Sequence, residues 1–512
     1  MKPSCFATVF FIVYYMTEEK MKAENTGSRS KQFMLTICAI IIISIFVVTV
    51  CSKSSPIYPL NDWDDPNCFF TVGKAMANGK VLYRDIFEQK GPLLYMLHEL
   101  TYFISQKTFL GVYFAEVISC AAFLIFSYKI ISLFTDKHKL LIVFPLAAFT
   151  YTSLSFCSGD SAEELCLPFL CFSFYTALSC IKRNKLMSLK NALLCGICTG
   201  VILWVKFTML GFFIGFILSF VIIYIRQKQY KKILSCALAV ISGVIISSLP
   251  VIIYCFRTDS FNSLFEVYFY DNMFLYSTGS ALPPVIKQIV NLFSGLVSFA
   301  AYNTFGFIFL VFGFVYSFRK EKTEFRILFS MTAASTFLFS FIGGRAYAYY
   351  PYVMMVFVPV GLTFLSEILR SKIKLRKPYP AVIISIISML AVLFLCRNTY
   401  LIFTPEDDLP QFRFAAIMEK TKDPTLLNYG FLDGGFYTVS GIVPDCRYFC
   451  ELNVELDEMY ETQKEYAEKG RVKYIVTKDE KPDFVLYELI DKCESVYWTQ
   501  TSTYYLYKLK SI

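Results

Sequence analysis

Eleven long apolar runs constrain the fold of this chain more than any other feature of its sequence. Each has roughly the 17–25 residues that an α-helix needs to cross about 30 Å of hydrocarbon. Hydrophobic residues account for 56% of the 512 residues and charged residues for only 17%, which excludes an ordinary soluble protein. The chain is therefore predicted to be an all-α polytopic membrane protein. The runs lie at 33–51, 109–128, 140–156, 164–181, 191–206, 209–225, 233–255, 298–318, 327–343, 349–369 and 379–396.

The connections between these runs alternate in charge. Six connections rich in Lys and Arg fall on one side of the membrane, and such connections stay in the cytoplasm. The N-terminus is accordingly expected inside the cell and everything after Arg397 outside it. The net charge of +9 reflects anchoring to anionic lipid headgroups and gives no reason to expect a nucleic-acid partner. The basic connections are 17–32, 129–139, 182–190, 226–232, 319–326 and 370–377.

Residues 1–32 are predicted to form a cytoplasmic N-terminal segment. The apolar run Cys5–Tyr15 within it is too short to cross a bilayer and lacks the small-residue cleavage pattern of a signal peptide. Met16 or Met21 is therefore an alternative start of the protein.

Residues 33–396 are predicted to form the membrane domain, with a long outer loop at 52–108. Gly196-Ile-Cys-Thr-Gly200 has the small-xxx-small spacing of close helix contacts, and we assign it to packing. No internal repeat of 20–50 residues is apparent, and the ionisable residues sit at the outer ends of the spans. Both features weigh against a repeat-built transporter.

Residues 397–512 change character, because charges become frequent and short β-rich runs appear. A helix-forming stretch, Glu455–Lys469, ends at Gly470, a typical helix stop. The sequence predicts a small α/β domain outside the membrane, in which Asp433-Gly434-Gly435 forms a turn. The β-rich runs are Thr425–Leu432, Arg471–Lys478 and Ser502–Lys510.

Cysteine and histidine usage excludes several kinds of site. Most of the 17 Cys lie inside predicted spans, where a thiol acts as a small apolar side chain. In the outer domain, Cys446 and Cys450 are candidates to pair with each other or with Cys493, or to remain free thiols. With only two histidines, His98 and His138, an imidazole zinc centre and a Ser-His-Asp triad are excluded. The sequence also lacks a phosphate-binding GxxxxGK[ST] element, so any energy source must arrive with the substrate.

The outer loop 52–108 concentrates charge at one lipid–water boundary, where we expect the chemistry to lie. Within it, Pro66–Asn78 has the pattern of a short helix that Gly79 ends. Asp65 would then stand at the N-cap, so a purely capping role is one interpretation of this residue. The charged residues on which this expectation depends are Asp62, Asp64, Asp65, Arg84, Asp85, Glu88 and Lys90.

A second helix, Pro92–Ile104, is predicted to start immediately after Lys90-Gly91. The amides at its N-terminus and the Lys90 ammonium together form an arrangement suited to a phosphate group. The alternative interpretation is that Lys90 pairs with Glu88 or extends to the membrane surface.

The loop as a whole resembles a known pattern. It is similar to the first outer loop of the GT-C glycosyltransferases related to protein O-mannosyltransferases and aminoarabinose transferases. In that family a carboxylate just after the first span acts in catalysis, and a lysine contacts the lipid phosphate of the donor. The resemblance assigns these roles to Asp65 and Lys90. The matching residues read Asp65-Pro-x2-Phe69…Met76-x2-Gly79…Tyr83-x-Asp85…Lys90-Gly-Pro-Leu-Leu-Tyr95.

Two departures from the family pattern leave alternatives open. Pro66 follows the carboxylate where the family often has Glu, and Gly91 follows the lysine where it often has Pro. Asp64 and Asp62 therefore remain alternatives for the working carboxylate.

Two further outer turns extend the resemblance. The family often places an acidic residue in the second outer loop, a role that fits Glu163 or Glu164. Both are also explained as first-turn acids favoured by the helix dipole. A late outer turn, in which Arg345 stands among Tyr347 and other tyrosines, resembles the place where a basic or aromatic group approaches the donor phosphate.

The resemblance implies an integral-membrane glycosyltransferase with a GT-C-like fold. It would move a sugar from a polyprenyl-phosphate-linked donor to an envelope glycan, lipid or protein on the outer face, with inversion at the sugar carbon. Asp65 would be the general base, Lys90 and Arg345 would stabilise the departing phosphate, and Glu164 would orient acceptor or sugar. No cofactor is implied, and a divalent metal is left open. The remaining candidates are Asp64 and Glu163 for catalysis, Arg84 for the phosphate, and Asp62, Tyr83, Asp85, Lys206 and Tyr347 for the substrate.

Two other functions remain as alternatives. A non-catalytic exporter or flippase of lipid-linked glycans would use the same outer charges without breaking a bond. A polymerase or ligase of the O-antigen type would be an enzyme with different loops. The loop from Asp65 to Lys90 favours the transferase, because a carrier has no need for a carboxylate and a phosphate site at a fixed spacing.

Overall fold

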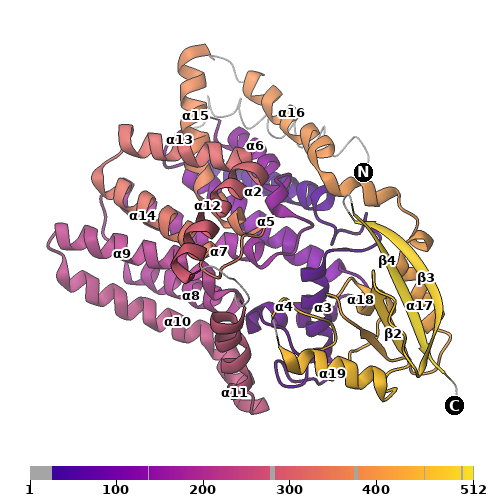
Figure 1. The fold of residues 1–512 in the computed structure, drawn as a ribbon. Coiled ribbons are helices and arrows are strands. Elements are labelled where there is room, and N and C mark those ends of the chain that lie inside the picture. Colours follow the sequence, from indigo (N-terminus) through magenta and orange to yellow (C-terminus); the bar gives the residue numbers. More distant parts are fainter. Residues whose placement is uncertain are drawn as a thin grey trace.

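The computed structural model describes residues 26–136, 138–276, 283–373, 379–454, 456–497 and 500–510. The run Cys5–Tyr15 and the alternative starts Met16 and Met21 lie outside the described residues. Figure 1 shows a bundle of long helices joined to a smaller mixed unit that contains the strands. This arrangement confirms the predicted fold class, an all-α membrane domain followed by a small C-terminal α/β domain.

Each of the eleven predicted runs overlaps a helix of the bundle, although not always with the same bounds. Among the described residues, seven helices are long and apolar enough to cross a membrane, or eight if a bent pair counts as one span. Others, such as α6 and α8, are apolar but shorter, so the total of eleven spans stays a prediction. The helices are α2 (Thr26–Cys51), α5 (Leu110–Ile131), α6 (Lys139–Tyr151), α7 (Ala162–Lys182), α8 (Leu189–Val205), α9 (Gly211–Arg226), α10 (Tyr230–Thr258), α13 (Thr304–Lys320), α14 (Thr323–Ser340), α15 (Val358–Ile373) and α16 (Tyr379–Leu395).

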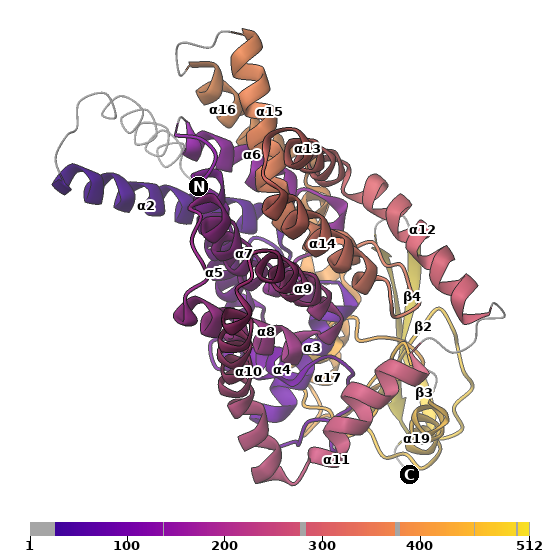
Figure 2. The same cartoon turned by 90° about the vertical axis from the view of Figure 1, so that its left-hand side faces the viewer.

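The segment 256–297, predicted as a plain outer loop, is largely helical. It contains α11 (Phe261–Ser263), the π-helix η3 (Leu264–Leu275) and the start of α12 (Pro284–Tyr302). The sequence scan missed α12 because polar residues interrupt its apolar run. Figure 2 shows α12 and α13 following one another along the edge of the bundle. The interrupting residues are Lys287, Gln288 and Asn291.

Small residues let α8 and α10 approach closely, as predicted. A Cβ at Gly196 would lie 2.2 Å from the carbonyl oxygen of Val240, and one at Gly200 would lie 2.0 Å from Ser247 Oγ. Gly243 on α10 has the reciprocal contact, with Leu193 O 2.3 Å from its Cβ position. Backbone approach of this kind is how membrane helices gain packing energy without a hydrophobic driving force.

The C-terminal domain contains one mixed sheet with the strand order β1-β2-β4-β3. The strands are β1 (Leu426–Asn428), β2 (Tyr474–Lys478), β3 (Tyr487–Tyr497) and β4 (Gln500–Leu509), and only β1 and β2 run parallel. The predicted helix 455–469 is observed as α19 (Asp457–Glu468). The other helices of this part are η5 (Arg397–Phe403), η6 (Glu406–Asp408), α17 (Pro410–Met418) and α18 (Phe436–Ser440).

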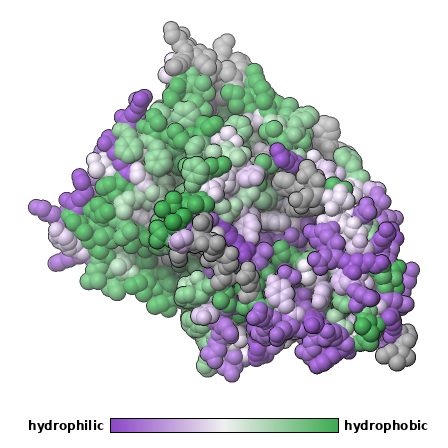
Figure 3. Space-filling view, in the orientation of Figure 1, coloured by the Kyte–Doolittle hydropathy of each residue, from purple (hydrophilic) through white to green (hydrophobic). Residues whose placement is uncertain are grey.

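The outer loop forms two helices that lie between the bundle and the C-terminal domain. These are α3 (Asp64–Ala77) and α4 (Pro92–Tyr102), and most of their side chains are buried. Figure 3 shows hydrophobic residues over the bundle and hydrophilic residues over the C-terminal domain. The charged outer loop therefore meets the apolar body at the boundary between these two parts. Shorter 3-10 turns, η1 (Leu154–Phe156), η2 (Phe207–Leu210) and η4 (Tyr350–Phe357), lead into the bundle helices beside it.

The alternation of basic connections predicts which face of the membrane each loop occupies. We expect a cysteine at Lys228, an exposed residue of the α9–α10 turn, to be shielded from an impermeant maleimide in intact cells. A cysteine at Asp407, an exposed residue of η6, should react fully. Both are made in a background in which the accessible native cysteines are serine. Labelling at position 228 but not at 407 would reverse the topology.

Candidate functional site

Two carboxylates stand in the first turn of α3. The helix begins at Asp64, followed by Asp65, and Trp63 occupies the N-cap without a side-chain capping bond. The prediction that Asp65 caps a helix starting at Pro66 is therefore wrong by two residues. The reason is that proline is tolerated throughout the first turn, where its missing N–H has no partner in any case.

The side chains of Asp64 and Asp65 make no hydrogen bond or ion pair with the part of the chain that the structure describes. Asp65 still acts on its surroundings, because its charge is felt at Lys90 and Glu88. The charge of Asp64 is felt instead at Tyr504 of the C-terminal domain. Burial raises the pKa of Asp64 to about 7. The two neighbouring carboxylates thus act on different parts of the molecule, Asp65 on Lys90 and Asp64 on the C-terminal domain.

Lys90 is held in place by its backbone. Its N–H donates to Glu88 Oε2 (3.0 Å) and to the Tyr95 hydroxyl (2.8 Å), and its carbonyl accepts from the Tyr83 hydroxyl (2.6 Å). The ammonium forms an ion pair with Glu88, 3.9 Å from its Oε1, as the alternative interpretation of the sequence expected, and lies 5.6 Å from the centre of the Phe69 ring. Burial opposes the charged form, but the carboxylates of Asp65 and Glu88 raise the pKa of Lys90 well above its ordinary value. Lys90 is therefore a fixed cation.

Gly91 explains one departure from the family pattern. Its N–H donates to Val205 O (3.1 Å), and a Cβ at this position would lie 2.1 Å from Trp204 O. Proline can satisfy neither requirement, since it lacks the N–H and is bulkier. Gly91 is also the N-cap of α4. Its contact with Trp204 therefore fixes the position of the neighbouring Lys90 relative to the end of α8.

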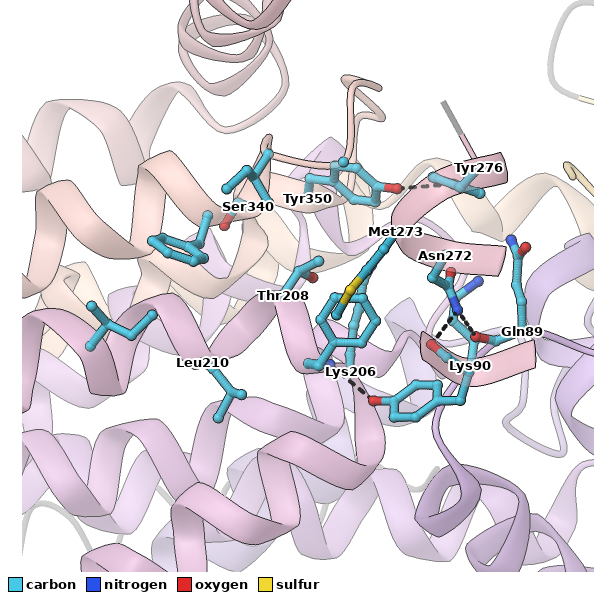
Figure 4. Close-up of a pocket in the computed structure, with 16 residues that line it drawn as sticks. Gln89, Lys90, Lys206, Thr208, Leu210, Asn272, Met273, Tyr276, Ser340 and Tyr350 are labelled. Atoms are coloured by element: carbon cyan, nitrogen blue, oxygen red, sulfur yellow. Dashed lines mark hydrogen bonds between the residues drawn. The ribbon is translucent and has the colours of Figure 1, made fainter. Parts of the chain in front are cut away.

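A cavity of about 400 Å³ opens beside Lys90. Figure 4 shows Lys90, Gln89 and Asn272 on one side of it and Leu210 on the other. The cavity is therefore polar at one end and apolar at the other. The apolar side chains of the lining include Leu210, Ile214, Met273, Phe339 and Ile342.

Lys206 brings a second cation to the cavity from the end of α8. It forms an ion pair with Glu163, and its ammonium lies 4.3 Å from the centre of the Tyr350 ring and 5.4 Å from that of Tyr349. Aromatic faces stabilise cations in such positions. Glu163 and Lys206, both predicted site residues, are therefore brought together at the cavity, which Lys206 lines.

Arg345 stands close to the same cavity, on the late outer turn. Its Nη1 donates to the Tyr347 hydroxyl (2.9 Å), and its guanidinium lies 4.4 Å from the centre of the Tyr276 ring. The Tyr276 hydroxyl is 3.1 Å from that of Tyr350, which lines the cavity. The half-buried Arg345 is thus connected to the cavity through two tyrosines.

Glu164 lies elsewhere, in a buried acidic cluster. Its side chain is fully buried, and both Glu164 Oε2 and Glu116 Oε1 accept from the backbone N–H of Asp160 at 2.9 Å. Ser52 donates to the other oxygen of Glu116. The predicted role of Glu164 in orienting a substrate is not supported by this position, since it does not line the cavity.

His98 completes this cluster. Its Nδ1 faces the carbonyl of Leu94 (2.8 Å), which only accepts, so Nδ1 carries a proton. Its Nε2 lies 2.9 Å from Asp160 Oδ2, so a second proton is shared between the imidazole and the carboxylate. Sequence analysis gave His98 no role. No group of three or more His, Cys, Asp or Glu among the described residues is arranged to hold a metal ion.

Four other predicted residues have structural partners. Asp62 forms an ion pair with the buried Lys53 (2.5 Å) and accepts from the Tyr400 hydroxyl (3.1 Å). Arg84 and Asp85 pair with each other at 2.9 Å on the outer surface, away from the cavity lining. Tyr83 holds the backbone of Lys90 through its hydroxyl and does not line the cavity itself.

Gln89 and Asn272 are cavity residues that sequence analysis missed. The Asn272 amide donates to Gln89 O (2.7 Å), whereas the buried Oε1 of Gln89 has no partner among the described residues. Asn272 lies on the π-helix η3, and no periodic signal in the sequence marked that element. Gln89 directly precedes Lys90 in the sequence, and this position is the signal from which it could have been predicted.

The cysteines of the C-terminal domain are arranged differently from the expected pairs. Cys450 Sγ lies 3.9 Å from Sγ of Cys68 on α3, and both thiols are buried and free. Cys446 and Cys493 are also free thiols. The free-thiol alternative is the one observed.

Comparison with known proteins places the fold. Residues 24–404 match the model of the family described as the putative competence-induced protein Ccs4 N-terminal domain. A search of curated proteins gives no match. The fold is similar to that of ArnT from Cupriavidus metallidurans bound to undecaprenyl phosphate, with a TM-score of 0.58 and 12% identity over 93% of this chain and 98% of that one. The apo structure of the same protein gives a TM-score of 0.49 at 12% identity and the same coverage. The GT-C-like fold that the sequence resemblance implied is thereby confirmed.

Gly91→Ala tests the contact between Gly91 and Trp204 that fixes the position of Lys90. The new Cβ would overlap the backbone of Trp204, so we expect a loss of about 1–3 kcal/mol in unfolding free energy. Thermal unfolding of the purified protein in detergent measures it. Gly343→Ala is the control, because the nearest atom to its Cβ position is 3.9 Å away. Equal unfolding temperatures for the two variants would contradict the packing argument.

Proposed function

We propose that this chain, which belongs to the family described as the putative competence-induced protein Ccs4 N-terminal domain, is an integral-membrane glycosyltransferase. It transfers a sugar from a polyprenyl-phosphate-linked donor to a hydroxyl group of an acceptor on the outer face of the membrane. The observation that carries the proposal is the cavity in which Lys90 and Lys206 meet an apolar wall, with the unpaired Asp65 near enough for its charge to act on Lys90. The fold shared with ArnT, whose structure holds undecaprenyl phosphate, supports it.

The cavity suits an amphiphilic donor. Lys90 and Lys206 supply positive charge for a phosphate, and the wall that includes Leu210 and Phe339 suits the first prenyl units. A phosphate group without a nucleotide also agrees with the lack of a nucleotide-binding motif in the sequence. The unpaired amide oxygen of Gln89 is available to accept from a sugar hydroxyl.

The proposed reaction is a single displacement. Asp65 takes the proton of the acceptor hydroxyl, whose oxygen attacks the anomeric carbon of the sugar. The bond from that carbon to the phosphate oxygen breaks, and the phosphate leaves with the electron pair. Lys90 stabilises the charge that grows on the phosphate, with Lys206 and Arg345 contributing from the far side.

Asp65 is a better candidate for the base than Asp64. Its charge is felt at Lys90, where the leaving group would lie, whereas that of Asp64 is felt at the C-terminal domain. Glu163 is a better candidate than Glu164 for contact with substrate, because it pairs with a cavity lysine. A non-catalytic carrier would have no use for the carboxylate. The effect of replacing Asp65 therefore distinguishes a transferase from a carrier.

Asp65→Asn should therefore fold normally, bind undecaprenyl phosphate, and lose roughly 10²–10⁴-fold in turnover, the usual contribution of a positioned base. Transfer is scored by mass spectrometry of envelope glycolipids and polymers from cells with and without the protein. Binding is followed by the shift in unfolding temperature with undecaprenyl phosphate. Full activity of Asp65→Asn would falsify the assignment of the base. Envelope products unchanged by loss of the whole protein would contradict the transferase and the carrier alike.

Asp64→Asn gives the matched control and a pH test. Because Asp64 titrates near pH 7, it is protonated below that pH and charged above it. A negative charge beside Asp65 favours the arrival of a proton there, so turnover should rise with pH through about 7 in the parent protein. Asp64→Asn should remove this rise and keep activity, whereas a dead Asp64→Asn protein would make Asp64 the base.

Lys90→Ala and Arg345→Ala test the phosphate site. Each should weaken donor binding or turnover by roughly 1.5–3 kcal/mol, the range for hydrogen bonds to charged groups. The double variant should be non-additive if both side chains act on one phosphate. Arg84→Ala, which removes an exposed ion pair on the outer surface, is the control. Unchanged binding and turnover in both single variants would remove these residues from the site.

A further inference from the structure

The C-terminal domain contacts α3 along one face of the helix. Asn67, Thr71 and Lys74 recur at the spacing that places side chains on one face. The Thr71 hydroxyl donates to Asp433 Oδ2 (2.7 Å), and the Lys74 ammonium donates to Tyr437 O (2.5 Å). All three α3 side chains are fully buried. The helix that carries the two carboxylates is thus attached to the C-terminal domain by polar bonds that water does not reach.

Asn67 extends this attachment to the first turn of α3. Its Nδ2 donates to Asn61 O (2.7 Å) and to Trp63 O (2.8 Å), the residue directly before Asp64. Its Oδ1 accepts from the Thr438 hydroxyl of the C-terminal domain (2.9 Å). Both amide hydrogens and the amide oxygen are therefore used, and the side chain has a single orientation. A continuous set of bonds runs from the C-terminal domain to the backbone that presents the carboxylates.

The Asp433-Gly434-Gly435 turn is shaped for this contact. Gly435 has φ +95, and a Cβ there would lie 3.2 Å from Asn67 Oδ1 in a conformation that L-residues rarely adopt. Asp433 Oδ1 accepts from the Gly435 N–H (3.0 Å) and from the Asn428 amide (3.1 Å). The sequence prediction of a turn is confirmed. The turn allows the backbone of the C-terminal domain to approach α3 closely.

We propose that the C-terminal domain is part of the catalytic unit, with Asn67 and Thr438 acting as positioning residues for Asp65. This inference rests on the proposed function, since it assumes that Asp65 is the base. Neither residue lines the cavity, so each acts through the backbone of the first turn of α3. Buried polar networks of this kind fix geometry strongly because their bonds have no competition from water. A displacement of about 1 Å at a reacting group can cost roughly 10²-fold in rate.

Thr438→Val is the decisive variant, because it keeps the shape of the side chain and removes only the bond to Asn67. The full-length protein in detergent is measured for turnover, for its affinity for undecaprenyl phosphate, and for amide hydrogen exchange in residues 61–68. We expect turnover to fall about 10–100-fold, affinity to stay within about twofold, and exchange to rise locally in residues 61–68. Thr438→Ser should restore all three values.

Thr421→Val is the matched control within the same domain. The Thr421 hydroxyl bonds to that of Tyr474 (2.5 Å) and does not contact α3. It should leave turnover and exchange in residues 61–68 unchanged.

Two outcomes would overturn the inference. One is normal turnover in Thr438→Val. The other is a loss of turnover that comes with raised exchange throughout the C-terminal domain and is not rescued by Thr438→Ser, since that describes only a destabilised fold. If Asp65→Asn proves fully active, the assignment of Asp65 as the base fails on its own. The exchange measurement on residues 61–68 still decides whether Thr438 positions this turn.

Discussion

Asp65 and Lys90 attract each other without forming an ion pair, and the outer part of the structure keeps them in this state. Lys90 pairs instead with Glu88 at 3.9 Å, beyond hydrogen-bond distance, so the hydrogens of its ammonium are available to a phosphate. The separation of Asp65 and Lys90 depends on two helices, because Asp65 lies in the first turn of α3 and Lys90 lies just before α4. Tyr83 and Tyr95 fix the backbone of Lys90, so the ammonium cannot collapse onto the carboxylate by backbone movement.

Most charged side chains near the site have an oppositely charged partner, in contrast to the unpaired carboxylates of Asp64 and Asp65. Lys53 with Asp62, Lys206 with Glu163, and His98 with Asp160 are all buried or partly buried pairs. Unpaired charge is costly in such surroundings and is retained mainly where chemistry uses it. The contrast between paired and unpaired groups therefore distinguishes Asp64 and Asp65 from the paired carboxylates of Asp62 and Asp160.

The outer loop is fixed by contacts both with the helix bundle and with the C-terminal domain. On the membrane side, Gly91 allows the start of α4 to rest against the backbone of Trp204. On the outer side, Thr438 bonds to Asn67, and Arg447 Nε donates to Tyr83 O (3.2 Å). Fixed positions of this kind reduce the reorganisation needed when charge develops during a reaction. This gives the C-terminal domain a physical task even though it contributes no side chain to the cavity lining.

The sequence by itself determined the membrane class, the helical runs, the small outer domain and the loop with Asp65 and Lys90. These follow from length and polarity, which act locally: a long apolar run must become a helix in lipid whatever surrounds it. The sequence did not determine where α3 starts, because proline is accepted at several positions of a first helical turn. It also did not reveal α12, because polar residues interrupt its apolar run. Only the tertiary structure decided which acids are free, since Asp62 and Asp65 look alike in sequence, but only Asp62 meets Lys53 and the distant Tyr400. The same holds for Glu163 and Glu164: adjacent residues on a helix point in different directions, and what each one meets depends on how the other helices pack.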